Sequence, residues 1–192
     1  VEKPQPAVKA TEEVKQEEKK WFVNFKSNTT SYEKFPFSQW SHVMRQVLNS
    51  GDEKLLQRMT ANGVLELRFA ICQYLLEFRN MSVAPNQIVV GSGTEALYTM
   101  LVQLLGRNSV YAVEKNKKKK VATVFEINGA NYVPINIEKN GINIEDLEQS
   151  CANVIHISPS HHFPTGLVMP VRCRGELLDW AAKDKNRFII ED

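Results

Sequence analysis

The sequence predicts an α/β protein with a largely parallel sheet, and two patterns indicate this class. In the second half of the chain, short apolar runs typical of strands alternate with segments of helical periodicity. Helices that separate successive strands are the usual crossovers of a parallel sheet. A Gly-rich turn at 91–93 and a Pro/Gly-rich loop at 159–166 each follow directly on a predicted strand. Loops in this position are where open α/β sheets bind ligands.

The first half of the chain is expected to be mainly helical. Ser38 is placed to cap the first helix, whose apolar residues from Trp40 to Leu48 recur at helical spacing. Pro85 should end the second helical element. The predicted elements are a helix at 38–48, a turn at 62–63, a helix at 65–78, a strand at 87–90 and a helix at 94–105.

The second half carries the alternation that sets the fold class. The apolar run at 154–158 has the uninterrupted character of a strand buried on both faces. The predicted elements are strands at 110–113, 132–137, 154–158 and 188–190, helices at 121–126, 144–150 and 176–183, and a turn at Gly141. No internal repeat interrupts this order.

Composition is that of one ordinary globular domain, or of part of a larger one. Of the 192 residues, 43% are hydrophobic and 24% are charged, which is too apolar for global disorder. Lys and Arg total 24 against 22 Asp and Glu, so the charge balance gives no global argument for nucleic acid or a membrane surface as partner. The sequence shows no secretory signal and no apolar run of transmembrane length. Three scattered Cys favour a reducing compartment, and we expect a cytoplasmic protein.

Residues 1–20 are expected to form a linker or tail. They contain five Lys, five Glu and two Pro, and the first aromatic residue of the chain is Trp21. Such a segment buries too little apolar surface to offset its ordering entropy. The chain also stops directly after a predicted strand, where a sheet should continue. We therefore expect a fragment whose folded part is 21–192.

The predicted strand–turn–helix unit at 91–97 can be read in two ways. Glycines let the backbone approach a ligand closely, and the free N–H groups of a helix start favour a phosphate. Alternatively, this is a tight turn in which Thr94 is a simple helix cap. It matches neither the spaced glycines of a dinucleotide fold nor a Walker A loop.

The loop at 158–166 has the sequence SPSHHFPTG and contains two adjacent histidines. Neighbouring side chains in an extended loop point apart, and neither an H-x-x-x-H spacing nor a Cys or Asp partner supports a metal site at His161 and His162. A structural loop remains the alternative to a ligand-binding one.

Two further features carry charge. Five Lys occupy the six positions 115–120, as either a local anion patch or a solvated loop, and the lack of interleaved aromatic residues favours the loop. Asp192 follows the strand at 188–190. Its carboxylate either caps the next element or faces a cationic ligand group such as a protonated ring nitrogen.

Together these segments resemble the aminotransferase-like domain of MocR-type transcriptional regulators of the GntR superfamily. The resemblance covers about residues 21–192, and the loop pattern P-S-H-x-F-P-T-G is specific to this branch. It implies the three-layer αβα fold of type I pyridoxal-phosphate (PLP) enzymes, with the large domain incomplete. The matching motifs are Phe35-Pro36 with Trp40, Gly63 with Leu67-Arg68, Pro85 to Ile88, Gly93 to Leu97, Ser158 to Gly166, Met169-Pro170, Glu176 to Ala181, and Ile189 to Asp192.

The resemblance implies roles for residues of this chain. Gly93, Thr94 and Glu95 match the helix start that receives the cofactor phosphate, and 161–163 match the loop that flanks the cofactor ring. Asp192 matches the Asp that pairs with the pyridine nitrogen and keeps the ring an electron sink. Residues 1–20 match the connector from an N-terminal winged helix-turn-helix DNA-binding domain that lies outside this chain.

The sequence departs from the family pattern at two places. After Glu114 the family has a Pro-Gly-aromatic turn whose ring stacks on the cofactor, whereas here Lys117 stands at the Gly position and Lys118 at the aromatic position. A Lys ammonium cannot stack on a pyridine ring, so either PLP binding is weakened or this loop is altered. The Schiff-base lysine would fall beyond residue 192.

The resemblance therefore implies a domain that senses an amine or amino-acid effector through PLP, in a dimeric regulator that binds DNA through its other domain. Without the Schiff-base lysine this chain should not catalyse transamination. The alternatives are a fragment of a true class I/II aminotransferase, and an interaction module with a dead cofactor pocket, a reading to which Lys117 and Lys118 lend weight.

Overall fold

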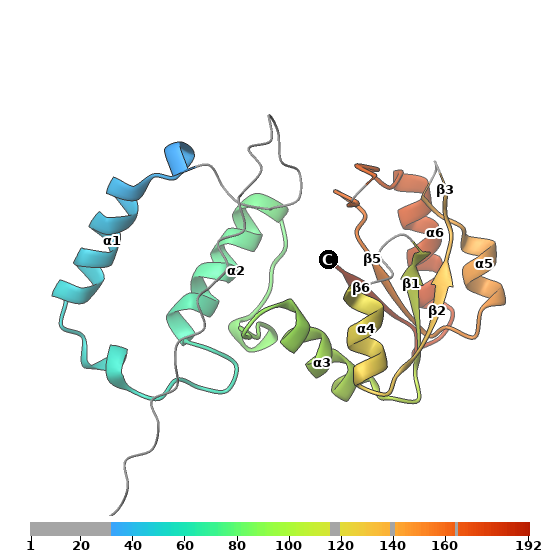
Figure 1. The fold of residues 1–192 in the computed structure, drawn as a ribbon, viewed down its shortest axis with the longest axis horizontal. Coiled ribbons are helices and arrows are strands. Elements are labelled where there is room, and N and C mark those ends of the chain that lie inside the picture. The colour runs from blue at the N-terminus through green and yellow to red at the C-terminus, as the bar shows by residue number, and fades with distance from the viewer. Residues whose placement is uncertain (1–31, 116–119, 139–140, 164) are drawn as a thin grey trace, which may run out of the picture. The chain divides into compact units, whose positions relative to one another are not determined.

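A computed structural model describes residues 32–115, 120–138, 141–163 and 165–192 of the chain (Figure 1). The predicted linker at 1–20 lies outside these residues, as do Lys117 and Lys118. The chain divides into two compact units, 1–57 and 58–192. Each unit is described by itself below.

The described part of the first unit is helical. It contains the 3₁₀ turns η1 (Tyr32–Lys34) and η2 (Glu53–Leu56) on either side of helix α1 (Phe37–Asn49). The predicted cap at Ser38 is wrong, because Pro36 holds the N-cap position and Ser38 already lies inside the helix. No described residue of this unit is buried.

The second unit begins with helix α2 (Leu65–Arg79), close to its predicted bounds. The helix ends earlier than Pro85 would impose, since Asn80 takes the left-handed conformation with φ 51°. The strand predicted at 87–90 is wrong. Pro85–Gln87 forms the 3₁₀ turn η3, and the Val90 N–H donates to the Asn62 carbonyl at 3.1 Å, which is a bond to a turn and not to a strand.

Four strands form one parallel sheet, which confirms the predicted fold class. They are β1 (Val110–Glu114), β2 (Asn131–Ile135), β5 (Val154–Ile157) and β6 (Phe188–Glu191), in the order β2-β1-β5-β6. Every pairing among them is parallel. Two residue pairs, in β3 (Ile137–Glu138) and β4 (Gly141–Ile142), form a separate antiparallel ladder, so the strand predicted at 132–137 is interrupted at Asn136.

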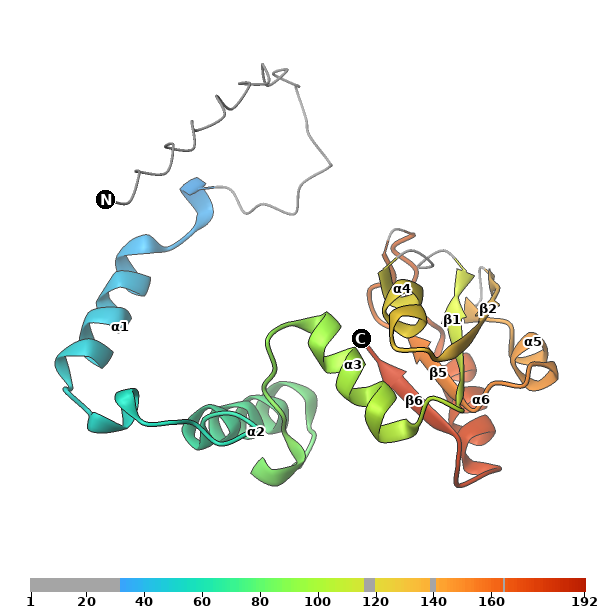
Figure 2. The ribbon, with the colours of Figure 1, turned by 60° about the horizontal axis from the view of Figure 1, so that its bottom comes forward.

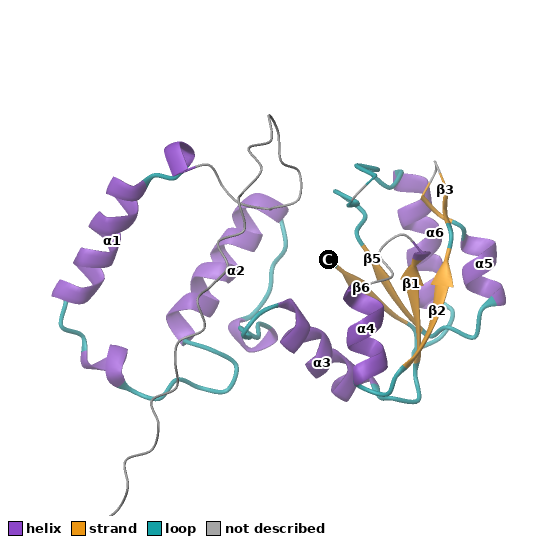
Figure 3. Cartoon of the chain, viewed as in Figure 1, coloured by secondary structure: helices purple, strands orange, loops and turns teal. Residues whose placement is uncertain are grey.

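Helices cover both faces of this sheet (Figures 2 and 3). They are α3 (Thr94–Leu105), α4 (Lys120–Ile127), α5 (Ile144–Gln149) and α6 (Val171–Ala182). Helix α6 begins five residues before the position predicted, directly after Pro170, whose fixed φ suits the start of a helix.

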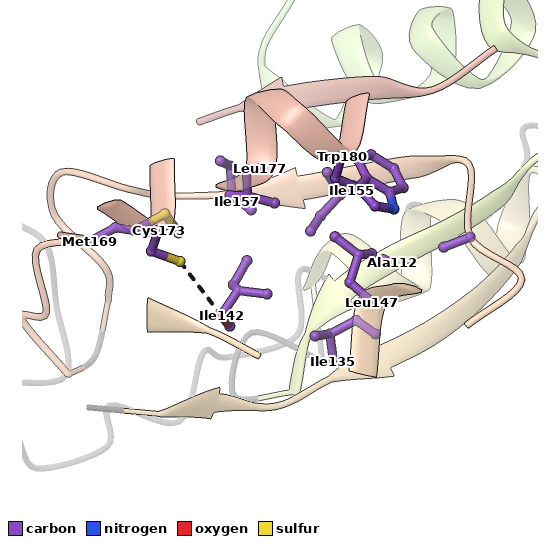
Figure 4. Close-up of a cluster of buried hydrophobic side chains, with 11 residues drawn as sticks. Ala112, Ile135, Ile142, Leu147, Ile155, Ile157, Met169, Cys173, Leu177 and Trp180 are labelled. Atoms are coloured by element: carbon purple, nitrogen blue, oxygen red, sulfur yellow. Dashed lines mark hydrogen bonds between the residues drawn. The ribbon is translucent and has the colours of Figure 1, made fainter. Parts of the chain in front are cut away.

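Two apolar cores follow from the alternation of side chains along the strands. On one face, Ala112 and Ile155 pack with Leu147 of α5 and with Leu177 and Trp180 of α6 (Figure 4). On the other face, the core consists of Tyr98, Val102, Tyr111, Val113, Val121, Val124, Phe125, Ala130 and Val154, from α3, α4 and the strands. The second unit is therefore a three-layer αβα structure.

The topology brings several polar residues to one edge of the sheet. Parallel strands share a carboxyl edge, so Glu114 of β1, Ser158 after β5 and Asp192 after β6 end at the same edge. Helix α3 joins β1 through the short connection 106–109, so its N-terminus lies at this edge as well. Among the described residues, no helix is long and apolar enough to cross a membrane.

Candidate functional site

The start of helix α3 is open to solvent. Gly93 occupies the N-cap with φ 109°, a conformation that L side chains rarely adopt, and it has no side chain to cap the first turn. Thr94 is the first helical residue and not the cap, and Thr94 and Glu95 are both exposed. The backbone N–H groups of this turn, at the positive end of the helix dipole, form an anion-binding geometry.

A buried arginine braces the segments that lead into this turn. The guanidinium of Arg68 in α2 donates from Nε to the Gly63 carbonyl at 3.2 Å and from Nη1 to the Pro85 carbonyl at 2.7 Å. Gly63 must be glycine, because a Cβ there would lie 2.7 Å from Cβ of Val90. These contacts fix the backbone just before 91–93.

Asp192 lies beside two buried polar side chains from other elements. The Tyr98 hydroxyl in α3 is 2.6 Å from Nε2 of His156 in β5, and the two side chains are 6% and 0% exposed. The pKa of Tyr98 is raised, first by burial and then by the charge of Asp192 and a hydrogen bond to it. The Asp192 backbone N–H donates to the Ile157 carbonyl at 2.9 Å, which extends the pairing of β6 with β5. The carboxylate itself belongs to an exposed residue.

A second polar cluster closes the loop that follows β5. Glu114 and His162 are 2% and 3% exposed, and Oε2 of Glu114 lies 3.1 Å from Nε2 of His162. The other oxygen of Glu114 accepts the backbone N–H of Ser158 at 3.2 Å. Nδ1 of His162 is 2.6 Å from Oγ1 of Thr165. Both ring nitrogens of His162 therefore face protein groups.

The two adjacent histidines separate as neighbours in an extended loop should. His161 is exposed, whereas His162 is buried against Glu114. In the part of the chain that the structure describes, no group of three metal-ligating side chains occurs. Lys118, which is also among the predicted cofactor-site residues, falls outside the described residues.

Sequence reasoning missed the residues that hold the site together. Tyr98 lies within an apolar helix stripe and His156 within a strand, so periodicity assigns both to the core, where they are. Arg68 and Glu114 were noted only as positions matching a family pattern. A polar residue inside a predicted core segment was the available signal for Tyr98, His156 and Glu114.

Comparisons with known proteins show which proteins this chain is similar to. No family model matches the chain. The chain is 32% identical over 176 residues to YdeL of Bacillus subtilis, an uncharacterized HTH-type transcriptional regulator, covering 92% of this chain and 38% of that protein. It is 28% identical to the probable rhizopine catabolism regulatory protein MocR of Rhizobium meliloti, over 82% of this chain and 32% of that protein. It is also 25% identical to the HTH-type pyridoxine biosynthesis regulator PdxR of Corynebacterium glutamicum.

The chain is similar to MocR-type transcriptional regulators. It spans less than two fifths of the length of these relatives. The motifs that carry the resemblance lie on the elements described above.

Solved structures show which fold the chain has. An archaeal alanine:glyoxylate aminotransferase superposes with a TM-score of 0.74 at 24% identity, over 84% of this chain and 42% of that one. The α-aminoadipate aminotransferase LysN of Thermus thermophilus, solved with N-(5'-phosphopyridoxyl)-L-leucine, superposes with a TM-score of 0.72 at 18% identity. The second unit thus has the fold of type I PLP-dependent transferases, as predicted.

Proposed function

We propose that this chain forms the cofactor-holding part of the effector domain of a PLP-dependent transcriptional regulator. One observation carries the proposal. The open N-terminus of α3 and the exposed carboxylate of Asp192 lie at the same edge of the sheet, and Tyr98, a residue of α3 itself, links them. A ligand with an anionic group for the α3 N-terminus and a cationic ring for the Asp192 carboxylate fits this pair of groups.

The residues present match the chemistry of PLP at two points. The α3 start, with Gly93, Thr94 and Glu95, offers backbone N–H groups to a phosphate. The carboxylate of Asp192 supplies the acceptor that a protonated pyridine nitrogen needs. Relatives of the same fold support this reading, because LysN was solved with a phosphopyridoxyl compound and a Pyrococcus horikoshii kynurenine aminotransferase with PMP.

Each residue of the site then has a task. Asp192 holds a proton on the ring nitrogen, and the first turn of α3 anchors the phosphate. His161, His162 and the rest of their loop flank the ring, with His162 held in place by Glu114. Lys118 stands where the family has an aromatic residue, and its ammonium group cannot stack on the ring. When bound, PLP supplies an aldehyde that reacts with primary amines.

The remainder of the function follows from the family. The effector is an amine or amino acid, since that is what PLP recognises. A winged-helix domain that precedes this chain, with 1–20 as connector, binds DNA, in keeping with the HTH-type names of the relatives. Binding of the effector shifts a homodimer between two states of different DNA affinity. We place the protein in the cytoplasm. The rival function, a true aminotransferase, would lack the winged-helix domain.

Equilibrium PLP binding tests the proposal, measured on this chain and on the same chain extended downstream in its natural context. We expect binding in the extended form and its loss by at least about tenfold in Asp192→Asn, as for a charged hydrogen bond of about 1.5–3 kcal/mol. Glu191→Gln is the matched control, because it removes a neighbouring exposed carboxylate. Failure of both forms to bind PLP would favour the dead-pocket reading.

A further inference from the structure

The residue that connects the two halves of the site is Tyr98, a polar residue within the apolar stripe of α3. It lies in the second turn of α3, behind the open helix start. Its hydroxyl contacts His156 at 2.6 Å, and the two rings meet edge-on with centroids 5.2 Å apart. Tyr98 also packs edge-on against Phe125 at 6.3 Å, so its ring has little freedom.

The strand register places Asp192 on the same side of the sheet. His156 pairs with Ile190, and Asp192 lies two residues further along the chain. Alternate residues of a strand share a face, so Ile190 and Asp192 point toward the layer that contains α3. The partly buried Ile190 does pack against the core that contains Tyr98.

The number of hydrogens available decides which atom donates each hydrogen bond in this cluster. The hydroxyl of Tyr98 has one hydrogen, and an ionised carboxylate only accepts. The strand register places Asp192 on the face where Tyr98 lies, and a hydrogen bond to Asp192 is one cause of the raised Tyr98 pKa, so we assign the hydroxyl hydrogen to the carboxylate. The short contact with His156 is then a bond in which Nε2–H donates to the Tyr98 oxygen.

We propose that Tyr98 is a positioning residue for Asp192, set in place by His156 through the chain His156 Nε2–H to Tyr98 Oη–H to the Asp192 carboxylate. This inference rests on the proposed function. The hydroxyl occupies one acceptor position of the carboxylate and orients the rest of the group toward the ring nitrogen. It also ties that carboxylate to the helix that anchors the phosphate.

The first experiment measures PLP affinity and the pH dependence of the visible absorption of bound PLP, in the full protein and in Tyr98→Phe. We expect affinity to fall about 3- to 10-fold, the loss of one hydrogen bond, and the absorption profile to move along the pH axis. Tyr111→Phe is the matched control, because that buried hydroxyl donates to the Gly106 carbonyl at 3.2 Å, at the other end of β1. A Tyr98→Phe protein that matches Tyr111→Phe in both measurements overturns the proposal.

The second experiment needs no cofactor and separates this inference from the proposed function. NMR of ¹⁵N-histidine-labelled chain reports the ring nitrogens of His156, assigned by comparison with His156→Gln. Asp192→Asn and Tyr98→Phe should both move the His156 Nε2 signal, whereas Glu191→Gln should not. If the protein fails to bind PLP but these shifts occur, the proposed function is wrong and the hydrogen-bond chain from His156 through Tyr98 to Asp192 is confirmed. If Asp192→Asn leaves the His156 Nε2 signal unchanged, the proposed hydrogen-bond chain is wrong, whether or not PLP binds.

Discussion

Two polar clusters lie at the carboxyl edge of the sheet, on opposite faces, and each contains a buried histidine. In one, His156 meets the neutral hydroxyl of Tyr98 and, through it, an exposed carboxylate, Asp192. In the other, His162 meets Glu114, and both side chains are buried. Glu114 shares the strand face of Ala112, whereas His156 shares that of Val154, which assigns the clusters to different layers.

The two clusters differ in the exposure of their carboxylates, since that of Asp192 is exposed to solvent and that of Glu114 is buried. Glu114 accepts the Ser158 N–H with one oxygen, and its other oxygen is buried 3.1 Å from Nε2 of His162. A buried carboxylate is tolerated only when it is paired. The Glu114 cluster therefore holds the loop in place, whereas the Asp192 cluster is the one that we propose for cofactor binding.

The largest effect should come from breaking the Glu114 cluster. Glu114→Ala removes the group that faces the buried Nε2 of His162, and a buried polar group left unsatisfied costs about 1–3 kcal/mol. Urea unfolding should show this loss, with a smaller one in Glu114→Gln, which keeps an acceptor for Ser158. Glu77→Ala, at an exposed site in α2, is the control. Equal stability of Glu114→Ala and Glu77→Ala would show that the Glu114 cluster does not stabilise the protein.

Alkaline pH should weaken the other cluster. The pKa of Tyr98 is raised by burial and by Asp192, and that of Tyr111 by burial. A raised pKa means that the neutral form is favoured in the folded state, so this stability is complete below the unfolded value near pH 10 and is lost above it. The free energy of unfolding should fall by up to about 1.4 kcal/mol per pH unit for each tyrosine. Tyr98→Phe should flatten the decline, measured by urea unfolding between pH 9 and about 11.

The smallest effect on stability should come from His161. Its side chain is exposed, so His161→Gln should change the free energy of unfolding by less than about 0.5 kcal/mol. Its PLP affinity should nevertheless fall, since the loop flanks the proposed ring position. His162→Gln should lower the free energy of unfolding more than His161→Gln does. A pair of variants that behave alike would remove the distinction between the exposed and the buried histidine.

Much of the fold could be predicted because it depends on local patterns. The strands at 110–113, 154–158 and 188–190 and the helix at 94–105 fall close to their observed bounds. The strand predicted at 87–90 failed for a tertiary reason, since an extended apolar run becomes a strand only when a neighbour pairs with it. Here its hydrogen bond goes to the 62–63 turn.

The first unit shows the same limit from the other side. Helix α1 forms where periodicity predicts it, yet none of its residues is buried. Its pattern specified a helix with an apolar face, including Trp40 and Val47, without specifying what that face contacts. The error at Ser38 is of a different kind, since Pro36 holds the N-cap position and no side chain caps this helix.

The sequence by itself determined the α/β class, the parallel sheet, the helix start at 93–95 and the position of Asp192 at a strand end. These depend on residue types and spacings along the chain. Only the tertiary structure decided which buried polar groups meet. Tyr98 and His156 are 58 residues apart, and they come together because sheet order and register align α3 with β5. The order and register of a sheet depend on packing between distant segments, and the local periodicity of a strand or helix does not contain that information.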